Sequence, residues 1–163
     1  MIDINPLCPD DWQVIRRVRL QSLHESPDAF TSTYEREATF DELIWRDRAT
    51  TCQWFVATEA GEAIGVAGGI DGLADDSSDR ELVGMWVAPS HRGRGTARRL
   101  LEAVGVWAEG QGATMLRLGV KESNVEAHDA YLRMGLRVSR ETRAAHAAPD
   151  RSVVIMVLDL EHH

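Results

Sequence analysis

A strand, a loop with two glycines and an amphipathic helix follow one another between residues 81 and 111. Residues 81–87 are mostly apolar and end just before Pro89, which predicts a β-strand. From Gly95 to about Gln111 apolar residues recur at helical spacing, so one face of this helix should be buried against a sheet or another helix. The apolar stripe consists of Ala97, Leu100, Leu101, Val104, Trp107 and Ala108.

The rest of the chain alternates between strand and helix patterns without a repeat or a linker. Together with the segment above, the predicted order is β-α-α-β-β-β-α-β-α-β-β, which indicates a mixed sheet with helices on both faces. With 163 residues, the chain has the length of one domain. The further strands are expected at 1–6, 52–58, 63–70, 115–120, 136–142 and 152–158, and the further helices at 10–25, 41–49 and 124–134.

The charge of the chain is distributed unevenly. The formal net charge is −8, which argues against binding to nucleic acid or to an anionic membrane surface. Four arginines nevertheless fall within eight residues that contain no acid, and we call them the arginine island: Arg92, Arg94, Arg98 and Arg99. An acidic chain with one basic island suggests a site for a single anion.

The loop before the helix at 95–111 has the features of a phosphate site. Its glycines allow close backbone approach, and the free N–H groups of the first helical turn favour a diphosphate. The alternative is a plain turn beside solvated arginines. The Walker A sequence is absent, Arg98 stands where a dinucleotide-binding fingerprint needs a third glycine, and Ser90 lacks the glycines of a hydrolase elbow.

The chain ends, cysteines and histidines suggest a cytoplasmic protein without a metal. We expect no signal peptide at the N-terminus and no membrane span, because no apolar run approaches about 20 residues. Cys8 and Cys52 match no metal or redox spacing, and the histidines form no ligand pattern. Residues 160–163 look like the remnant of an expression tag. The oligomeric state stays open between monomer and homodimer.

Two motifs resemble those of the GNAT superfamily of acyl-CoA-dependent N-acetyltransferases. The segment Arg92-Gly93-Arg94-Gly95-Thr96-Ala97 is similar to the family signature Arg/Gln-x-x-Gly-x-Gly/Ala, directly after a strand. The second motif, Asn124-x-x-Ala127-x-x-x-Tyr131-x-x-x-Gly135-Leu136, follows at the expected distance, with leucine where the family has phenylalanine. The resemblance implies a single GNAT-like domain over residues 1–158. Its fold would be α/β (α+β), with about four helices and a mixed, mostly antiparallel sheet of about seven strands, splayed in the middle.

The resemblance also implies where acetyl-CoA binds. The amides of residues 92–97 would hold its pyrophosphate, and the pantetheine arm would lie along the strand through Met85 and Val87. Gly84 would form the bulge that splays this strand from the next one, and Asn124, which is also a plausible ordinary N-cap, would lie near the pantetheine. The expected cofactor-binding residues are Met85, Trp86, Val87, Arg92, Gly93, Arg94, Gly95, Thr96, Ala97, Asn124 and Tyr131.

Two residues are candidates for proton transfer. Tyr131 resembles the family tyrosine that protonates the departing CoA thiolate, although its place on an apolar stripe also suits a core aromatic. Glu81 stands where the family often has a glutamate that takes the proton from the amine, and a solvated strand end is the competing interpretation. A water chain could serve as the base instead.

The function expected from these features is acetyl transfer from acetyl-CoA to a primary amine by direct attack. The acceptor could be a small molecule or a protein amine, and the acidic surface, including Asp75 and Asp76, would attract a cationic one. By resemblance, residues 27–30 and 144–149 would line the acceptor site, while the acidic loop at 71–79 is expected to be mobile. The rival hypothesis is a non-catalytic acyl-CoA-binding sensor.

Overall fold

The computed structural model describes residues 1–71, 78–139 and 153–160, and it confirms the predicted order of elements. The strands are β1 (Ile2–Pro6), β2 (Gln53–Glu59), β3 (Glu62–Asp71), β4 (Asp79–Val87), β5 (Met115–Lys121), β6 (Arg137–Val138) and β7 (Val153–Asp159). The helices are α1 (Trp12–Glu25), α2 (Tyr34–Glu37), α3 (Glu42–Thr51), α4 (Thr96–Gly110) and α5 (Val125–Arg133). Short 3-10 turns lie at Pro9–Asp11, Pro27–Ala29 and Pro89–His91.

Three differences from the sequence prediction concern short segments. The sequence did not predict the single turn α2, because four residues are too few for a periodic pattern; Thr33 caps it by accepting a hydrogen bond from the Arg36 amide. β4 starts two residues earlier than predicted, and residues 72–77 of the acidic loop lie outside the described residues. The described part of the strand expected at 136–142 pairs over 137 and 138.

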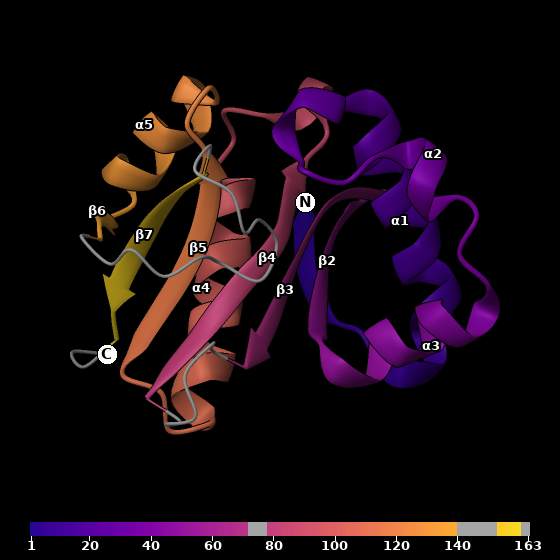
Figure 1. Cartoon of the computed structure of the whole chain (residues 1–163), viewed down its shortest axis with the longest axis horizontal. Coiled ribbons are helices and arrows are strands. Elements are labelled where there is room, and N and C mark those ends of the chain that lie inside the picture. Colours follow the sequence, from indigo (N-terminus) through magenta and orange to yellow (C-terminus); the bar gives the residue numbers. More distant parts are fainter. Residues whose placement is uncertain (72–77, 140–152, 161–163) are drawn as a thin grey trace.

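The seven strands form one mixed, mostly antiparallel sheet in the order β1-β2-β3-β4-β5-β7-β6 (Figure 1). Its parallel ladder joins β4 to β5, and it covers only 79–81 against 115–117. Beyond Glu81 the ladder between these two strands ends, and β5 pairs with β7 on its other side. The sheet is therefore splayed in the middle, as expected.

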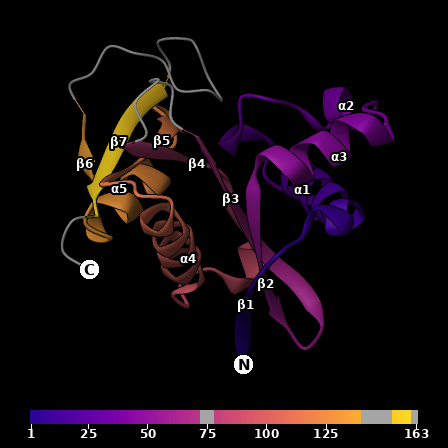
Figure 2. The ribbon, with the colours of Figure 1, turned by 90° about the horizontal axis from the view of Figure 1, so that it is seen from below.

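Helices cover both faces of the sheet, and each face has its own core (Figure 2). On one face α4 buries its predicted stripe, with Leu100, Val104 and Ala108 fully inaccessible, and α5 packs beside it. On the other face lie α1, α2 and α3, with Ile15 and Trp45 at the centre of a second core. The splay between β4 and β5 opens where these two layers meet.

A β-bulge in β4 accompanies the splay. Val66 of β3 lies opposite Trp86, but Gly68 lies opposite Val83, so β4 has one extra residue in between. Gly84 has a φ of 65°, which favours glycine, and a Cβ there would lie 3.0 Å from the Trp54 ring. The bulge predicted at Gly84 is confirmed.

The C-terminal end of β7 continues into the core. Leu160, expected to begin a tag remnant, is buried, and its amide donates a hydrogen bond to the Thr114 carbonyl at 2.8 Å. Leu160 therefore packs as part of the fold, while 161–163 lie outside the described residues. Among the helices that the structure describes, none is both long and apolar enough to cross a bilayer.

Candidate active site

Two cavities meet at the splay between β4 and β5. The first cavity, of about 760 Å³, lies between the end of β4, the N-terminus of α4, the turn after α1, and α5. The second cavity, of about 620 Å³, lies between the helical layer α1–α3 and the splayed strands. Ala29, Met85, Asn124, Ala127 and Tyr131 line both cavities, so these residues mark the junction.

The first cavity brings together nearly all residues that the sequence assigned to cofactor binding. Ten of the eleven line it, from β4, the loop before α4, and α5. The exception is Arg94, whose side chain points to the hairpin between β2 and β3 and pairs with Glu59 at 2.8 Å. A role for Arg94 in ligand binding would therefore depend on its backbone amide.

The N-terminus of α4 is suited to an anion. Its N-cap is Gly95, with a φ of 82° and no side chain to occupy the free amides of the first turn. The Thr96 hydroxyl is buried and has no hydrogen-bond partner among the described residues. The first turn also contains Arg98, although the positive end of a helix dipole favours acids. A bound phosphate would compensate all three features, so these residues fit the pyrophosphate of CoA.

The arginine island divides into two pairs. Arg92 and Arg98 line the first cavity. Arg94 binds Glu59, and the guanidinium of Arg99 donates to the Ile2 carbonyl of β1. The other two arginines thus connect the loop before α4 and the N-terminal end of α4 to β2 and β1.

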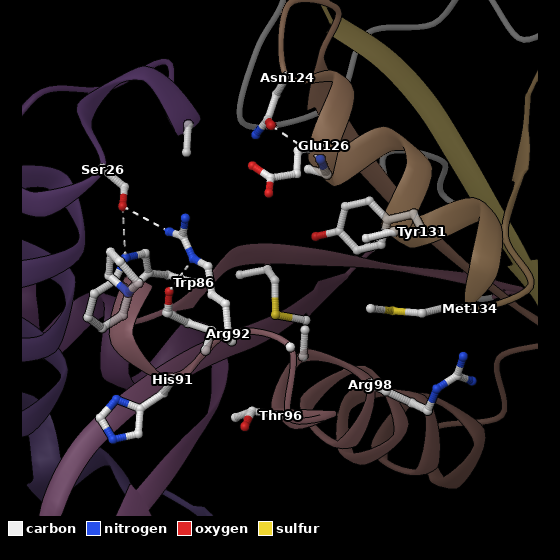
Figure 3. A pocket seen from close by; sticks show the side chains of 18 of the residues that line it. Ser26, Trp86, His91, Arg92, Thr96, Arg98, Asn124, Glu126, Tyr131 and Met134 are labelled. Atoms are coloured by element: carbon white, nitrogen blue, oxygen red, sulfur yellow. Dashed lines mark hydrogen bonds between the residues drawn. The ribbon is translucent and has the colours of Figure 1, made fainter.

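A small hydrogen-bond network on Ser26 fixes one wall of the first cavity. The Ser26 hydroxyl accepts from Trp86 Nε1 at 3.2 Å and from Arg92 Nη2 at 3.1 Å, and Arg92 Nε donates to the Val87 carbonyl at 2.9 Å. Figure 3 shows this group across the cavity from Tyr131 and Met134. Ser26 directly follows the helix predicted at 10–25, and its hydrogen-bond partners lie 60 and 66 residues away, so no local pattern revealed this network.

Tyr131 projects from α5 into the junction of the two cavities. Its ring is buried, and its hydroxyl is directed into the first cavity (Figure 3). Burial raises the pKa of the Tyr131 phenol, so this group keeps its proton throughout the neutral range. Asn124 caps the same helix, with its side-chain oxygen accepting from the Ala127 amide at 3.2 Å. Its predicted role as an N-cap is confirmed.

Glu81 lies in the second cavity, at the last residue of β4 that pairs with β5. Its side chain is 2% exposed, which rules out the solvated strand end. Its neighbour in the ladder is Arg117, a buried arginine that pairs with Asp79 at 3.3 Å. Glu81 and Tyr131 thus line one continuous space.

The structure also places side chains that the sequence analysis missed. Arg133 and Met134 line the first cavity, while Arg19, Glu37 and Arg48 line the second. Arg19 stands four residues after Ile15 on the buried face of α1, and a charge at that spacing was the available signal. Pro27, Asp28, Ala29 and Phe30 line one or both cavities, whereas 144–149 lie outside the described residues.

The described residues contain no group of three or more His, Cys, Asp or Glu side chains arranged for a metal ion. The candidate site combines the glycine loop before α4, Tyr131 and the buried Glu81.

Comparison with known proteins agrees with this geometry. The sequence model described as "Acetyltransferase (GNAT) family" matches residues 20–136, well over half of the chain. Both motifs, from Arg92 and from Asn124, fall within this range. Among curated proteins, none matches the sequence at a significant level.

Solved structures of similar fold cover nearly the whole chain. An acetyltransferase of the GNAT family from Staphylococcus aureus Mu50 has a TM-score of 0.76 at 16% identity, covering 99% of this chain and 100% of that one. The putative acetyltransferase yncA from Salmonella typhimurium, with its cofactor acetyl-CoA, has a TM-score of 0.68 at 21% identity, covering 100% and 96%. The PaiA N-acetyltransferase from Thermoplasma acidophilum, in complex with coenzyme A, has a TM-score of 0.69 at 17% identity, covering 98% and 99%. At these identities the similarity shows the fold alone.

Proposed function

Because the chain belongs to the GNAT acetyltransferase family, we propose that it transfers an acetyl group from acetyl-CoA to a primary amine by direct attack. The observation that carries this proposal is the junction of the two cavities at Tyr131. One cavity ends in an anion-binding loop suited to CoA, and the other opens on the far side of the same tyrosine. A donor and an acceptor can therefore meet at one point.

In this proposal the first cavity binds acetyl-CoA. The pyrophosphate lies on the amides of residues 92–97, and Arg98 adds charge-assisted hydrogen bonds. The pantetheine arm lies along β4, whose edge facing β5 is not paired beyond Glu81, so its N–H and C=O groups can bond to the amides of the arm. Asn124 stands at the start of α5 beside this path.

The chemistry then needs three proton transfers. Glu81 takes a proton from the acceptor ammonium, and the amine nitrogen attacks the thioester carbonyl, forming a C–N bond. The nitrogen of the tetrahedral intermediate loses a second proton to solvent. When the intermediate collapses, the C–S bond breaks and the Tyr131 hydroxyl gives its proton to the departing sulfur. Solvent returns a proton to Tyr131, and Glu81 releases the one it took. The raised pKa of Tyr131 keeps the acid in its active form.

The amine arrives as an ammonium ion, and the net charge of −8 would favour the approach of cations to the molecule. We further propose a cytoplasmic location, since Cys8 and Cys52 are both free thiols, as a reducing compartment would keep them.

Tyr131→Phe tests the function and the role of its hydroxyl together. We expect kcat for CoA release with an accepted amine to fall by about 100-fold or more, because the thiolate loses its proton donor. The KM for acetyl-CoA should change by no more than about threefold, since the ring and the anion loop stay in place. The readout is thiol release from acetyl-CoA across a panel of amines.

The rival function, a non-catalytic acyl-CoA sensor, gives a different result in the same assay. A sensor would bind CoA tightly and release no thiol with any amine. Unchanged turnover in Tyr131→Phe would instead keep the enzyme and remove Tyr131 from its mechanism.

A further inference from the structure

The second cavity has a charge balance opposite to that of the whole chain. Although the chain carries a formal charge of −8, the charged side chains lining this cavity comprise four basic and two acidic residues among the described ones. The basic residues come from α1, α2, α3 and the end of β5, so the excess is assembled by the fold. The six are Arg19, Arg36, Arg48, Lys121, Glu37 and Glu81.

Glu37 is fully engaged with two of these arginines. It is 1% exposed and accepts hydrogen bonds from Arg19 Nε and Nη2, both at 3.1 Å, and from Arg48 Nη1 at 2.6 Å. One carboxylate therefore faces two guanidinium groups, and one positive charge in this cluster is not balanced by it.

The Arg19 donors that do not bind Glu37 lie near the bulge in β4, and the guanidinium lies over the Phe30 ring, with its central carbon 4.8 Å from the ring centroid. Among the described residues its side-chain hydrogen bonds run only through Nε and Nη2, to Glu37. Nη1 lies 3.8 Å from the position that a Cβ on Gly84 would occupy, at the bulge in β4. The side chain of Arg19 is 13% exposed and lines the second cavity, so it is largely removed from bulk water. A guanidinium held in this way gains most from a bound anion.

We propose that the amine acceptor also carries an anionic group, and that Arg19 binds this group with help from Lys121. The acceptor class is a small amino acid or another amine with a carboxylate, phosphonate or phosphate. The proposal rests on the amine transfer inferred above: Tyr131 and Glu81 line the same cavity, so the amine lies toward them and the anion toward the bulge. It refines the expectation of a cationic acceptor, since only the ammonium end of such a molecule is positive.

The test uses matched acceptors that differ in the anion alone. Each L-amino acid is assayed against its carboxamide and its decarboxylated amine, by thiol release from acetyl-CoA and by calorimetric binding to the CoA-loaded protein. The proposal expects at least one acid to exceed both of its partners in kcat/KM by about 10-fold or more, the effect of one charge-assisted hydrogen bond.

Variants then assign the preference to Arg19. In Arg19→Gln the KM for the acid should rise by about 10- to 100-fold while kcat changes less, and Arg19→Lys should restore part of the loss. Arg17→Gln is the matched control, because Arg17 lies on the same helix and is exposed away from the cavity. Lys121→Gln, at the end of β5, should also raise the KM for the acid. This variant tests the proposal if Arg19→Gln does not fold.

The outcomes separate this inference from the proposed function. If the carboxamides or decarboxylated amines are acetylated as well as the matching amino acids, or better, the proposed anion site is wrong and the proposed acetyltransferase function stands. Acids that bind in an Arg19-dependent way, without any thiol release, would uphold the anion site and overturn the proposed function. Loss of binding in Arg17→Gln equal to that in Arg19→Gln would also overturn the assignment.

Discussion

Neighbouring residues of identical type have different roles in this protein. Arg98 and Arg99 are adjacent on α4, both are exposed, and each donates to a backbone carbonyl, that of Arg133 and that of Ile2 respectively. Of the two, Arg98 alone lines the first cavity. The direction of each side chain follows from the 100° step of the helix, which sends consecutive residues to different sides. Residue type alone therefore does not show which of the two arginines faces the cavity.

The pair offers a direct comparison of the two arginines. Arg98→Gln should raise the Kd for CoA by about three- to tenfold. This effect is smaller than that of losing a buried charge-assisted hydrogen bond, because Arg98 is exposed. The loss should shrink at high salt, since exposed charges are screened. Arg99→Gln should leave CoA binding unchanged and lower stability slightly. Isothermal calorimetry at two salt concentrations measures this, and equal losses in both variants would contradict the division of the arginine island.

In the proposed mechanism the general base is Glu81, which is buried and lines the second cavity. Glu81→Gln removes the proton acceptor without a large change in volume, so kcat should fall by about 100-fold and the acidic limb of its pH profile should change. Glu81→Asp keeps a carboxylate and should retain the limb at a lower rate. The measurement is kcat against pH with one amine for all three proteins. An unaltered profile in Glu81→Gln would assign the base to water.

At the scale of elements, the loop before α4 and the bulge in β4 build the site by departing from regular structure. Gly95 takes a left-handed conformation to present the first amides of α4, and Gly84 takes one to turn β4 away from β5. The bulge was predicted from a glycine within a strand pattern, whereas the loop glycines were expected only to allow close backbone approach. The point at which β4 and β5 separate was not predicted, because it depends on where the backbone pairing between the two strands ends.

Gly95 and Gly110 stand at the two ends of α4. Substituting each of them distinguishes the effect of backbone strain from that of a steric clash. A Cβ at either position meets no atom within 4 Å, but only Gly95 has a positive φ. Gly95→Ala should therefore cost about 1–2 kcal/mol of stability and raise the KM for acetyl-CoA, because the loop must shift. Gly110→Ala should be neutral or stabilising by up to about 1 kcal/mol. Denaturant unfolding and acetyl-CoA kinetics test both, and a normal KM in Gly95→Ala would argue against amide binding of the pyrophosphate.

At the scale of the whole molecule, net charge describes neither cavity. The value of −8 sums the whole chain, whereas the described lining of the first cavity has three acidic residues and three arginines, and that of the second has two acidic and four basic residues. Glu37 shows how closely such a cluster is joined to the fold, since its carboxylate links α1, α2 and α3 through Arg19 and Arg48. Burial raises the pKa of Glu37, but the hydrogen bonds from Arg19 and Arg48 outweigh it and lower the pKa to about 2.

This carboxylate should make the stability of the molecule pH-dependent. The pKa is about 2 in the folded state against an ordinary 4.5, so as pH falls the unfolded chain binds the proton first. The stabilisation, about 3 kcal/mol by this difference, is complete above pH 4.5 and is lost as pH falls toward 2. Glu37→Gln should lower the free energy of unfolding by about this amount at pH 7, and the gap to the wild type should close in acid.

Glu42→Gln is the control for Glu37→Gln. Glu42 forms an exposed pair with Arg46 on α3, with side chains 58% and 51% exposed, so its loss should cost about 0.5 kcal/mol or less. Urea unfolding at several pH values distinguishes the two carboxylates. A pH-independent gap between Glu37→Gln and the wild type would show that this carboxylate is not the titrating group.

The sequence by itself determined the features that depend on neighbours along the chain: the order of elements, the stripe of α4, the bulge at Gly84 and the cap at Asn124. Periodicity, glycine placement and capping are local, so they can be recognised without knowing the fold. The tertiary structure alone decided that Glu81 is buried, that the arginine island divides, and that the second cavity is basic in an acidic protein. These properties depend on side chains from separate elements, such as Arg19, Glu37 and Arg48, whose burial and partners exist only once the two layers pack against the sheet.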